Sequence, residues 1–369
     1  MRVGTARSAA VQWVGEHARP DPGFRGAYFS GSTVGLPDDA VLSPFSDVDV
    51  VVVTAAPVPP VGPGKFRFRG ALLEVSHLPW EEFASADEVL SSYHLAGSFR
   101  RDTVIDDPTG RLRALGAEVS RRFAEPCWVR RRYLDAERRI GTRLAAFDVS
   151  APFHAQVLSW LFPTGVTTHV LLAAALRNPT VRLRYRAARE VLDAYGQARL
   201  YPELLELLGC ARLSARGTGR HLDELARTFD ATAAVARTPF FFSGDLTAGA
   251  RPVAIDGSRY LIERGDHREA VFWIIATFAR CHTVLAADAP ELHRARLPAF
   301  RAAVADLGIT STDDLLRRGQ EVIAFLPGLR RTAERILASG PVGAIGPDGP
   351  VGPVGAVGAV GADITGTTG

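Results

Sequence analysis

The stretch GSTVGLPDDAVLSPFSDVDVVVV, residues 31–53, ends in four consecutive valines that follow two closely spaced aspartates. The valines predict a buried strand over Asp47–Thr54. Residues two apart on a strand point to the same face, so the carboxylates of Asp47 and Asp49 share one face about 6.5–7 Å apart. Burying two like charges at this spacing without a partner is costly. The pattern therefore indicates either a cation between them or a strand end that opens into water.

The neighbouring segments add further polar groups to this strand. The preceding strand ends in Gly31-Ser32, where a glycine lets the backbone approach a ligand closely. The following strand carries Glu74 within ALLEVSHLP. Carboxylate oxygens are the ligands that Mg²⁺ prefers, and Mg²⁺ usually accompanies nucleotide phosphates. The sequence therefore predicts a magnesium site at Asp47, Asp49 and Glu74 beside a phosphate-binding turn.

Composition indicates a soluble protein of about two domains. The chain has 369 residues, of which 47% are hydrophobic and 22% charged. We read no apolar run close to the roughly 18 residues needed to span a bilayer, and no signal-peptide core near the N-terminus. Three widely spaced cysteines, Cys127, Cys210 and Cys281, fit a reduced compartment and argue against structural zinc. We therefore expect a cytoplasmic protein without a membrane association.

The charged residues are distributed unevenly. Lys65 is the only lysine, so lysine-dependent chemistry is confined to that position. Residues 1–99 hold 7 basic and 11 acidic residues, whereas residues 100–143 hold 12 arginines and 7 acidic residues. An acidic segment followed by an arginine-rich one suggests that cations and phosphates meet near this junction.

Residues 1–125 alternate helix and strand patterns, which predicts an α/β (α+β) domain with a small mixed sheet. The expected helices there cover residues 5–17, 81–99 and 110–122, and the expected strands cover residues 25–31, 47–54, 66–78 with a bend at Gly70, and 102–106.

Residues 126–338 are predicted to form a mostly α-helical domain. The expected helices cover residues 127–147, 152–177, 183–208 and 221–236, then one starting at a capping box of Asp266 with Glu269, and two more before residue 339. We also expect a hairpin around Asp256-Gly257. Residues 339–369 carry a glycine at every third position from Gly340 to Gly361, typical of a disordered Gly/Pro/Val tail.

These residues resemble the nucleotidyltransferases of the DNA polymerase β superfamily. The match consists of a strand ending in Gly-Ser, then Ser-Asp-x-Asp on the next strand, then an acidic residue on a third: Gly31, Ser32, Ser46, Asp47, Asp49 and Glu74. It is closest to small-molecule enzymes such as kanamycin and lincosamide nucleotidyltransferases, which pair this domain with a helical one. The motif covers residues 25–76. Between Ser32 and Asp47 lie fourteen residues, slightly more than the family usually has.

The resemblance implies transfer of a nucleoside monophosphate from an NTP, most simply ATP, to a hydroxyl of a small molecule, with release of pyrophosphate. Asp47 and Asp49 would hold Mg²⁺, and Glu74 would be a metal ligand or the general base. The residues implied to contact the nucleotide are Gly31, Ser32 and Ser46. Glu81 and Glu82 compete with Glu74 for the role of base.

Several alternatives stay open. The acceptor could be RNA or protein, as in toxin-like relatives, or the chain could be a nucleotide-binding module without turnover. One arginine is expected to contact the triphosphate, and the candidates are Arg100, Arg101 and Arg130–Arg132 at the start of the second domain. Related enzymes often build the acceptor site across a homodimer.

Overall fold

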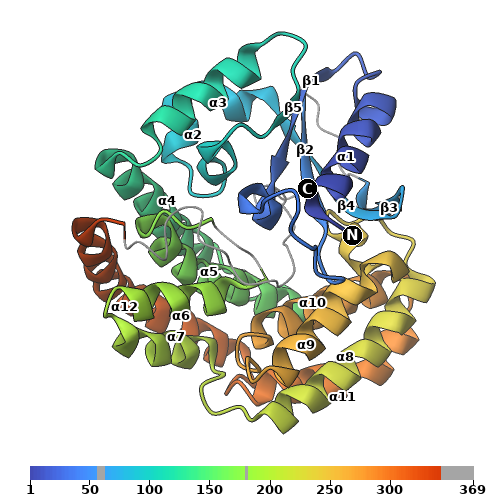
Figure 1. Ribbon diagram of the computed structural model, residues 1–369. Coiled ribbons are helices and arrows are strands. Elements are labelled where there is room, and N and C mark those ends of the chain that lie inside the picture. The colour runs from blue at the N-terminus through green and yellow to red at the C-terminus, as the bar shows by residue number, and fades with distance from the viewer. Residues whose placement is uncertain (56–62, 179–181, 342–369) are drawn as a thin grey trace.

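The computed structural model describes residues 1–55, 63–178 and 182–341 (Figure 1). Its N-terminal part contains a five-stranded mixed sheet with the strand order β3-β4-β2-β1-β5. β2 runs parallel to β4, and the other neighbours are antiparallel. The strands are β1 (Phe24–Ser30), β2 (Val48–Thr54), β3 (Gly64–Phe68), β4 (Ala71–Pro79) and β5 (Val104–Asp106), and the α-helices of this part are α1 (Val3–Trp13), α2 (Ala86–Ser91) and α3 (Arg111–Arg122).

The four valines are buried because β2 is the central strand and both faces of the sheet are covered. Val50 and Val52 pack into a core with residues of α1, and Val51 and Val53 pack into a core with residues of α2 and α3. An antiparallel strand with one solvated face would show alternating polar residues, so the continuous apolar run reflects this double covering.

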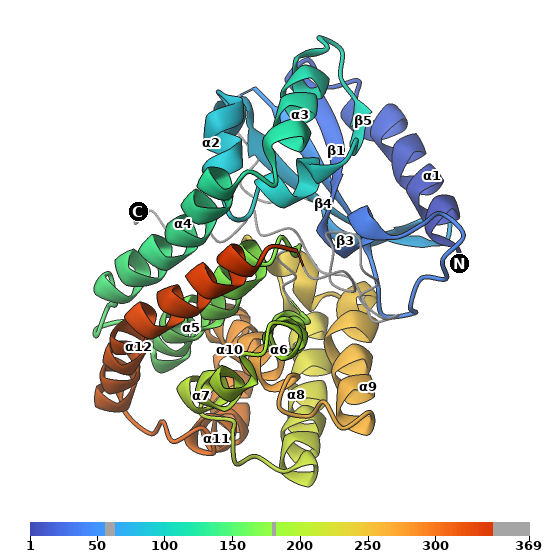
Figure 2. The same ribbon diagram turned by 60° about the vertical axis from the view of Figure 1, so that its left-hand side comes forward.

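The rest of the chain is mostly helical and lies beneath the sheet (Figure 2). Its helices are α4 (Pro126–Ala145), α5 (Phe153–Ala174), α6 (Arg184–Ala194), α7 (Tyr201–Leu208), α8 (Ala215–Val235), α9 (Gly257–Glu263), α10 (Val271–Asp288), α11 (Pro290–Ala305) and α12 (Thr312–Ser339). By length and composition alone α5 and α10 could cross a membrane, but 83% and 72% of their apolar windows are buried inside the molecule. Their burial is that of core helices, and their composition corrects the expectation that no apolar run approaches the length of a membrane span.

The mixed α/β N-terminal part and the helical remainder confirm the predicted fold class at this level. The bend at Gly70 is also confirmed. Arg69 and Gly70 both have positive φ, +48° and +83°, and join β3 to β4 as a two-residue hairpin turn. The domain boundaries stay predictions, and the tail beyond residue 341 lies outside the described residues.

The predicted helix over residues 81–99 is wrong. The segment forms three short pieces, namely the 3₁₀ helix Trp80–Phe83, α2, and the 3₁₀ helix Ala96–Arg100. Ser85 caps the start of α2 through a hydrogen bond from the Glu88 N–H, and Ser92 adopts an extended backbone that ends it. Polar side chains of this kind compete with the helix for its own backbone groups.

Three predictions in the helical part are also wrong. The helix over residues 183–208 is split at Gly196, which has a φ of +66°. The hairpin at Asp256-Gly257 is helical instead, because Gly257 begins α9. The capping box at Asp266 does not form: α10 begins at Val271, and Asp266 pairs with Arg189.

Candidate metal centre

The register of the sheet aligns one residue from each of four neighbouring strands. Ser30 of β1 pairs with Asp49 of β2, which in turn pairs with Glu74 of β4. Glu74 also pairs with Lys65 of β3. Residues paired across strands share a face of the sheet, so these side chains form one row. Asp47 immediately precedes β2 and, two residues before Asp49, points to the same side.

The three predicted carboxylates converge at this row. Asp47, Asp49 and Glu74 each offer an oxygen within 4.8 Å of the other two. Asp47 and Asp49 are completely buried, and Glu74 is largely buried. Among the described residues, both oxygens of Asp49 and Oδ1 of Asp47 have no hydrogen-bond donor. Buried carboxylates normally pair or bind a metal, so these residues offer a fitting set of ligands for a divalent cation.

Lys65 supplies one positive charge beside the carboxylates. Its ammonium Nζ lies 2.7 Å from Glu74 Oε2 and 3.3 Å from Asp47 Oδ2, and the residue is only 7% exposed. One signal for it is visible in the sequence, because Lys65 is the only lysine among 43 basic residues. The hairpin of β3 and β4 carries it to the carboxylates, and that register was not predicted.

Asp245 enters the same site from the helical part, between α8 and α9. Its Oδ1 accepts a hydrogen bond from Lys65 Nζ at 2.8 Å, and its Oδ2 accepts one from Arg280 Nη1 at 2.7 Å. Asp245 lies 180 residues from Lys65 in the chain, shortly after the aromatic run Phe240–Phe242. No local pattern links the two, so sequence analysis missed it.

Two arginines of the helical part add further positive charge. The Arg280 guanidinium lies 5.1–5.8 Å from the centres of four aromatic rings and pairs with Asp245. Burial lowers the pKa of Arg182, and the nearby carboxylates of Asp47, Asp245 and Glu74 oppose that shift. Nη1 of Arg182 is buried and has no hydrogen-bond partner among the described residues.

Burial and crowding shift the pKa values of the acidic groups in different directions. Burial, together with the charges of Asp47 and Glu74, raises the pKa of Asp49 well above its usual range. Burial raises the pKa of Glu74 to about 7, although Lys65 opposes the shift. Burial acts the same way on Asp245, but Lys65 and Arg280 outweigh it and lower the pKa of Asp245 to about 2. The negative charge is therefore more firmly held at Asp245 than at Asp49 or Glu74.

The predicted phosphate turn begins directly after β1. Gly31 has a φ of +68° and its carbonyl accepts a hydrogen bond from Asn178 Nδ2 at 2.6 Å. Ser32 is half-buried in the short 3₁₀ helix Gly31–Gly35. Ser46 is half-buried and directly precedes Asp47. Ser32 and Ser46 therefore flank the segment that leads into the carboxylates.

Glu81, Glu82 and Arg130–Arg132 lie away from the carboxylates, whereas Arg100 approaches the predicted phosphate turn, since a Cβ on Gly35 would lie 2.6 Å from its Nη2. Glu81 and Glu82 follow the end of β4, whereas Glu74 lies near its start, so they are at opposite ends of the strand. Arg130 pairs with Glu334 at 2.9 Å, Arg131 stacks on Trp128 and Arg132 is buried, which leaves the three arginines in structural contacts rather than at the carboxylates.

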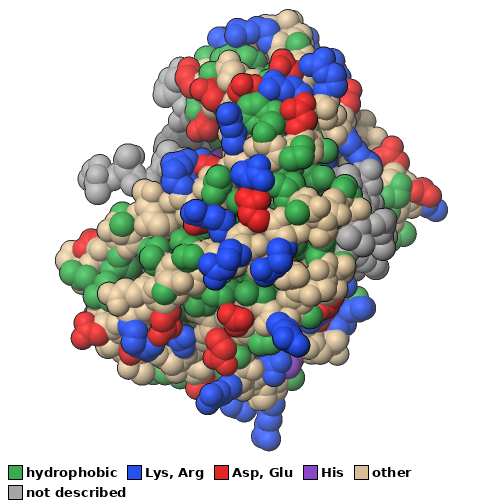
Figure 3. Space-filling model, turned by 90° about the vertical axis from the view of Figure 1, so that its left-hand side faces the viewer, with side chains coloured by type: hydrophobic (Ala, Val, Ile, Leu, Met, Phe, Trp, Pro, Cys, Tyr) green, Lys and Arg blue, Asp and Glu red, His purple; other side chains and the backbone are tan. Residues whose placement is uncertain are grey.

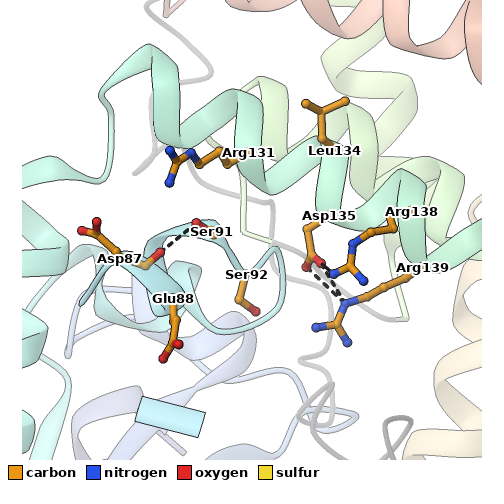
Figure 4. A pocket seen from close by; sticks show the side chains of 9 residues that line it. All are labelled: Asp87, Glu88, Ser91, Ser92, Arg131, Leu134, Asp135, Arg138 and Arg139. Carbon is orange, nitrogen blue, oxygen red and sulfur yellow. Dashed lines mark hydrogen bonds and ion pairs between the residues drawn. The ribbon is translucent and has the colours of Figure 1, made fainter. Parts of the chain in front are cut away.

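Basic and acidic side chains are interspersed on the face that includes α4 and α12 (Figure 3). A cavity of about 540 Å³ lies between α2 and α4, and its lining mixes both charges (Figure 4). Its lining residues are Asp87, Glu88, Ser91, Ser92, Arg131, Leu134, Asp135, Arg138 and Arg139. None of the three clustered carboxylates lines it, so this cavity is separate from the candidate metal centre.

Comparison with protein-family models, with curated proteins and with solved structures gives no significant match for this chain.

Proposed function

We propose that the chain is a Mg²⁺-dependent nucleotidyltransferase that moves a nucleoside monophosphate from an NTP, most simply ATP, to a hydroxyl of a small molecule. The observation that carries this proposal is the convergence of Asp47, Asp49 and Glu74 with buried carboxylate oxygens that lack a donor. The mixed sheet that carries them and the Gly-Ser turn beside it are consistent with the nucleotidyltransferase fold that the motif suggests.

Charge balance supports a polyphosphate substrate. Three clustered carboxylates favour a divalent cation, and a bound cation then attracts phosphate oxygens. Positive charge from Lys65, Arg182 and Arg280 borders the same site. We propose Arg182 as the arginine that contacts the triphosphate, because its buried Nη1 lacks a partner in the described residues. Gly31, Ser32 and Ser46 remain the proposed contacts at the adjacent turn.

In the proposed reaction the acceptor oxygen forms a bond to the α-phosphorus while the bond between that phosphorus and the bridging oxygen of the β-phosphate breaks. The bridging oxygen leaves with pyrophosphate, and the hydroxyl proton passes to a base. When bound, Mg²⁺ would neutralise charge on the phosphates. Asp47 and Asp49 would hold it, and Glu74 either completes the ligand set or takes the proton. A pKa of about 7 suits Glu74 to the second role.

The test uses NTPs labelled at the α-phosphate, with Mg²⁺, on wild type, Asp49→Asn and the matched control Asp230→Asn. Asp230 is exposed and pairs with Arg251, so the control makes the same change of charge in an ordinary ion pair. The acceptors are hydroxylated antibiotics, a small-molecule cell filtrate, bulk tRNA and total protein. We expect label in a small-molecule fraction with wild type and Asp230→Asn, and none with Asp49→Asn.

Other outcomes would redirect the assignment. Label in tRNA or protein would establish the alternative acceptor class. Transfer that persists in Asp49→Asn would show that the carboxylate row of Asp47, Asp49 and Glu74 takes no part in the reaction. Nucleotide binding without transfer to any fraction would favour a binding module.

A further inference from the structure

Lys65 and a divalent cation need the same oxygen atoms. The ammonium of Lys65 contacts Glu74 Oε2 at 2.7 Å and Asp47 Oδ2 at 3.3 Å, and both carboxylates belong to the cluster that could hold a metal. One ammonium carries a single positive charge against three crowded carboxylates. A divalent cation would balance more of that charge, but it must take these oxygens from Lys65.

Asp245 offers Lys65 a partner that a cation at the carboxylate cluster would leave undisturbed. Its own position is fixed, because its second oxygen accepts a hydrogen bond from Arg280, which is itself buried among aromatic rings. The backbones also meet closely here: a Cβ on Gly64 would lie 2.5 Å from the Cα of Gly244. Two glycines thus allow the approach that joins Lys65 to Asp245.

We propose that Lys65 is a built-in competitor of the divalent cation, and that Asp245 is a positioning residue that retains Lys65 when the cation binds. Cation binding is thereby coupled to the contact between β3 and the segment before α9. This inference rests on the proposed metal site and goes beyond it, because it concerns what controls the affinity of that site. Asp245 acts through Lys65 and is not a ligand of the cation.

We expect variants at Lys65 and Asp245 to change metal affinity in opposite directions. The measurement is Mn²⁺ electron paramagnetic resonance without nucleotide. Lys65→Met removes the competitor, so Mn²⁺ should bind roughly tenfold more tightly, within the range for residues that share an ion-pair network. Asp245→Asn leaves Lys65 with only the cluster carboxylates as partners, so Mn²⁺ should bind several-fold more weakly. The double variant should match Lys65→Met, and Asp230→Asn should match wild type.

The double variant separates this inference from simple charge effects. If Asp245→Asn weakened Mn²⁺ binding equally in the Lys65→Met background, Asp245 would act through space and the inference would be wrong. Unchanged or weaker binding by Lys65→Met would also overturn it, while the proposed function would stand. Absence of Mn²⁺ binding by wild type would overturn this inference, and the labelled-NTP transfer assay would then decide the proposed function separately.

A second measurement needs only the wild type, in case the variants do not fold. Lys65 is the only lysine, so lysine labelled with ¹³C at Cε in an untagged chain gives a single signal in the NMR spectrum. Saturation with Mg²⁺ should move this signal, because Lys65 loses its contacts with Asp47 and Glu74 when the cation binds and keeps only Asp245. A signal that does not move although Mn²⁺ competes with Mg²⁺ for the site would contradict the inference.

Discussion

The carboxylate row and the arginine-rich segment over residues 100–143 both carry many charges. They differ in whether those charges have partners. In the row, Asp49 is buried and its oxygens have no donor among the described residues. In the segment, arginines form ion pairs with carboxylates, such as Arg113 with Asp102 and Arg139 with Asp135. A candidate site is therefore distinguished by buried charges without partners, and not by the number of charges alone.

The largest expected effect is at the row. Asp49→Asn should reduce nucleotidyl transfer by roughly a hundredfold or more, because the proposed cation loses a ligand. The same variant should unfold at an equal or higher temperature, because it removes one of several crowded like charges. Transfer assays and thermal unfolding of one preparation check both outcomes. A large loss of stability would mean that the Asp49 carboxylate stabilises the fold, so the row would no longer differ from the arginine-rich segment.

In the arginine-rich segment, a change at Arg132 should lower stability without affecting metal binding, the reverse of the result expected for Asp49. It is buried, and its guanidinium donates to the carbonyl oxygens of Leu90 at 3.2 Å and Phe123 at 2.5 Å. Arg132→Met keeps an apolar stem but leaves both carbonyls without this donor, so we expect a loss of about 2–4 kcal/mol in the free energy of unfolding. Urea unfolding measures it. Mn²⁺ affinity should not change, and a changed affinity would link this arginine to the site.

His94 lies against the same segment and should make stability depend on pH. Burial, with the nearby Arg139 and Arg143, lowers the pKa of His94 to about 3. Below a pH of about 6.5 this histidine is protonated in the unfolded chain but stays neutral in the folded chain. The free energy of unfolding therefore falls as pH drops below about 6.5. The loss approaches about 1.4 kcal/mol per pH unit.

Unfolding at pH 7.5, 6 and 5 tests this, with His94→Asn as the comparison. The asparagine can keep the contact with Ser92 Oγ, which His94 Nδ1 makes at 2.9 Å, but it does not titrate. The slope of stability with pH should be smaller in the variant. An identical slope would assign the acid sensitivity to other groups.

The smallest effect is expected where charges are exposed and paired. Arg113 and Asp102 meet at 3.0 Å with side chains that are 51% and 70% exposed. Exposed pairs of this kind contribute about 0–1 kcal/mol, so Arg113→Gln should change the free energy of unfolding by less than about 1 kcal/mol. Urea unfolding beside Arg132→Met checks the contrast. A loss as large as that of Arg132→Met would show that exposure does not determine how much each arginine contributes to the free energy of unfolding.

Much of the fold could be read from short-range patterns. The run of valines and the helical periodicities act over a few residues, and they identified β2 and the helical part. The errors arose where local polar groups or glycines decided the outcome, as at Ser92 and Gly196. Their hydrogen bonds and backbone angles carry little periodic signal.

Local sequence alone places Asp47 and Asp49 on one face of a buried strand and shows that burying them together needs a compensating charge. How that charge is arranged depends on the packing of the whole chain. Lys65 reaches the row through the register of the β3–β4 hairpin, and Asp245 reaches Lys65 from the helical part. The periodicity of a strand is fixed by local backbone geometry, whereas strand register and contacts between distant segments follow from packing and electrostatics summed over the whole chain.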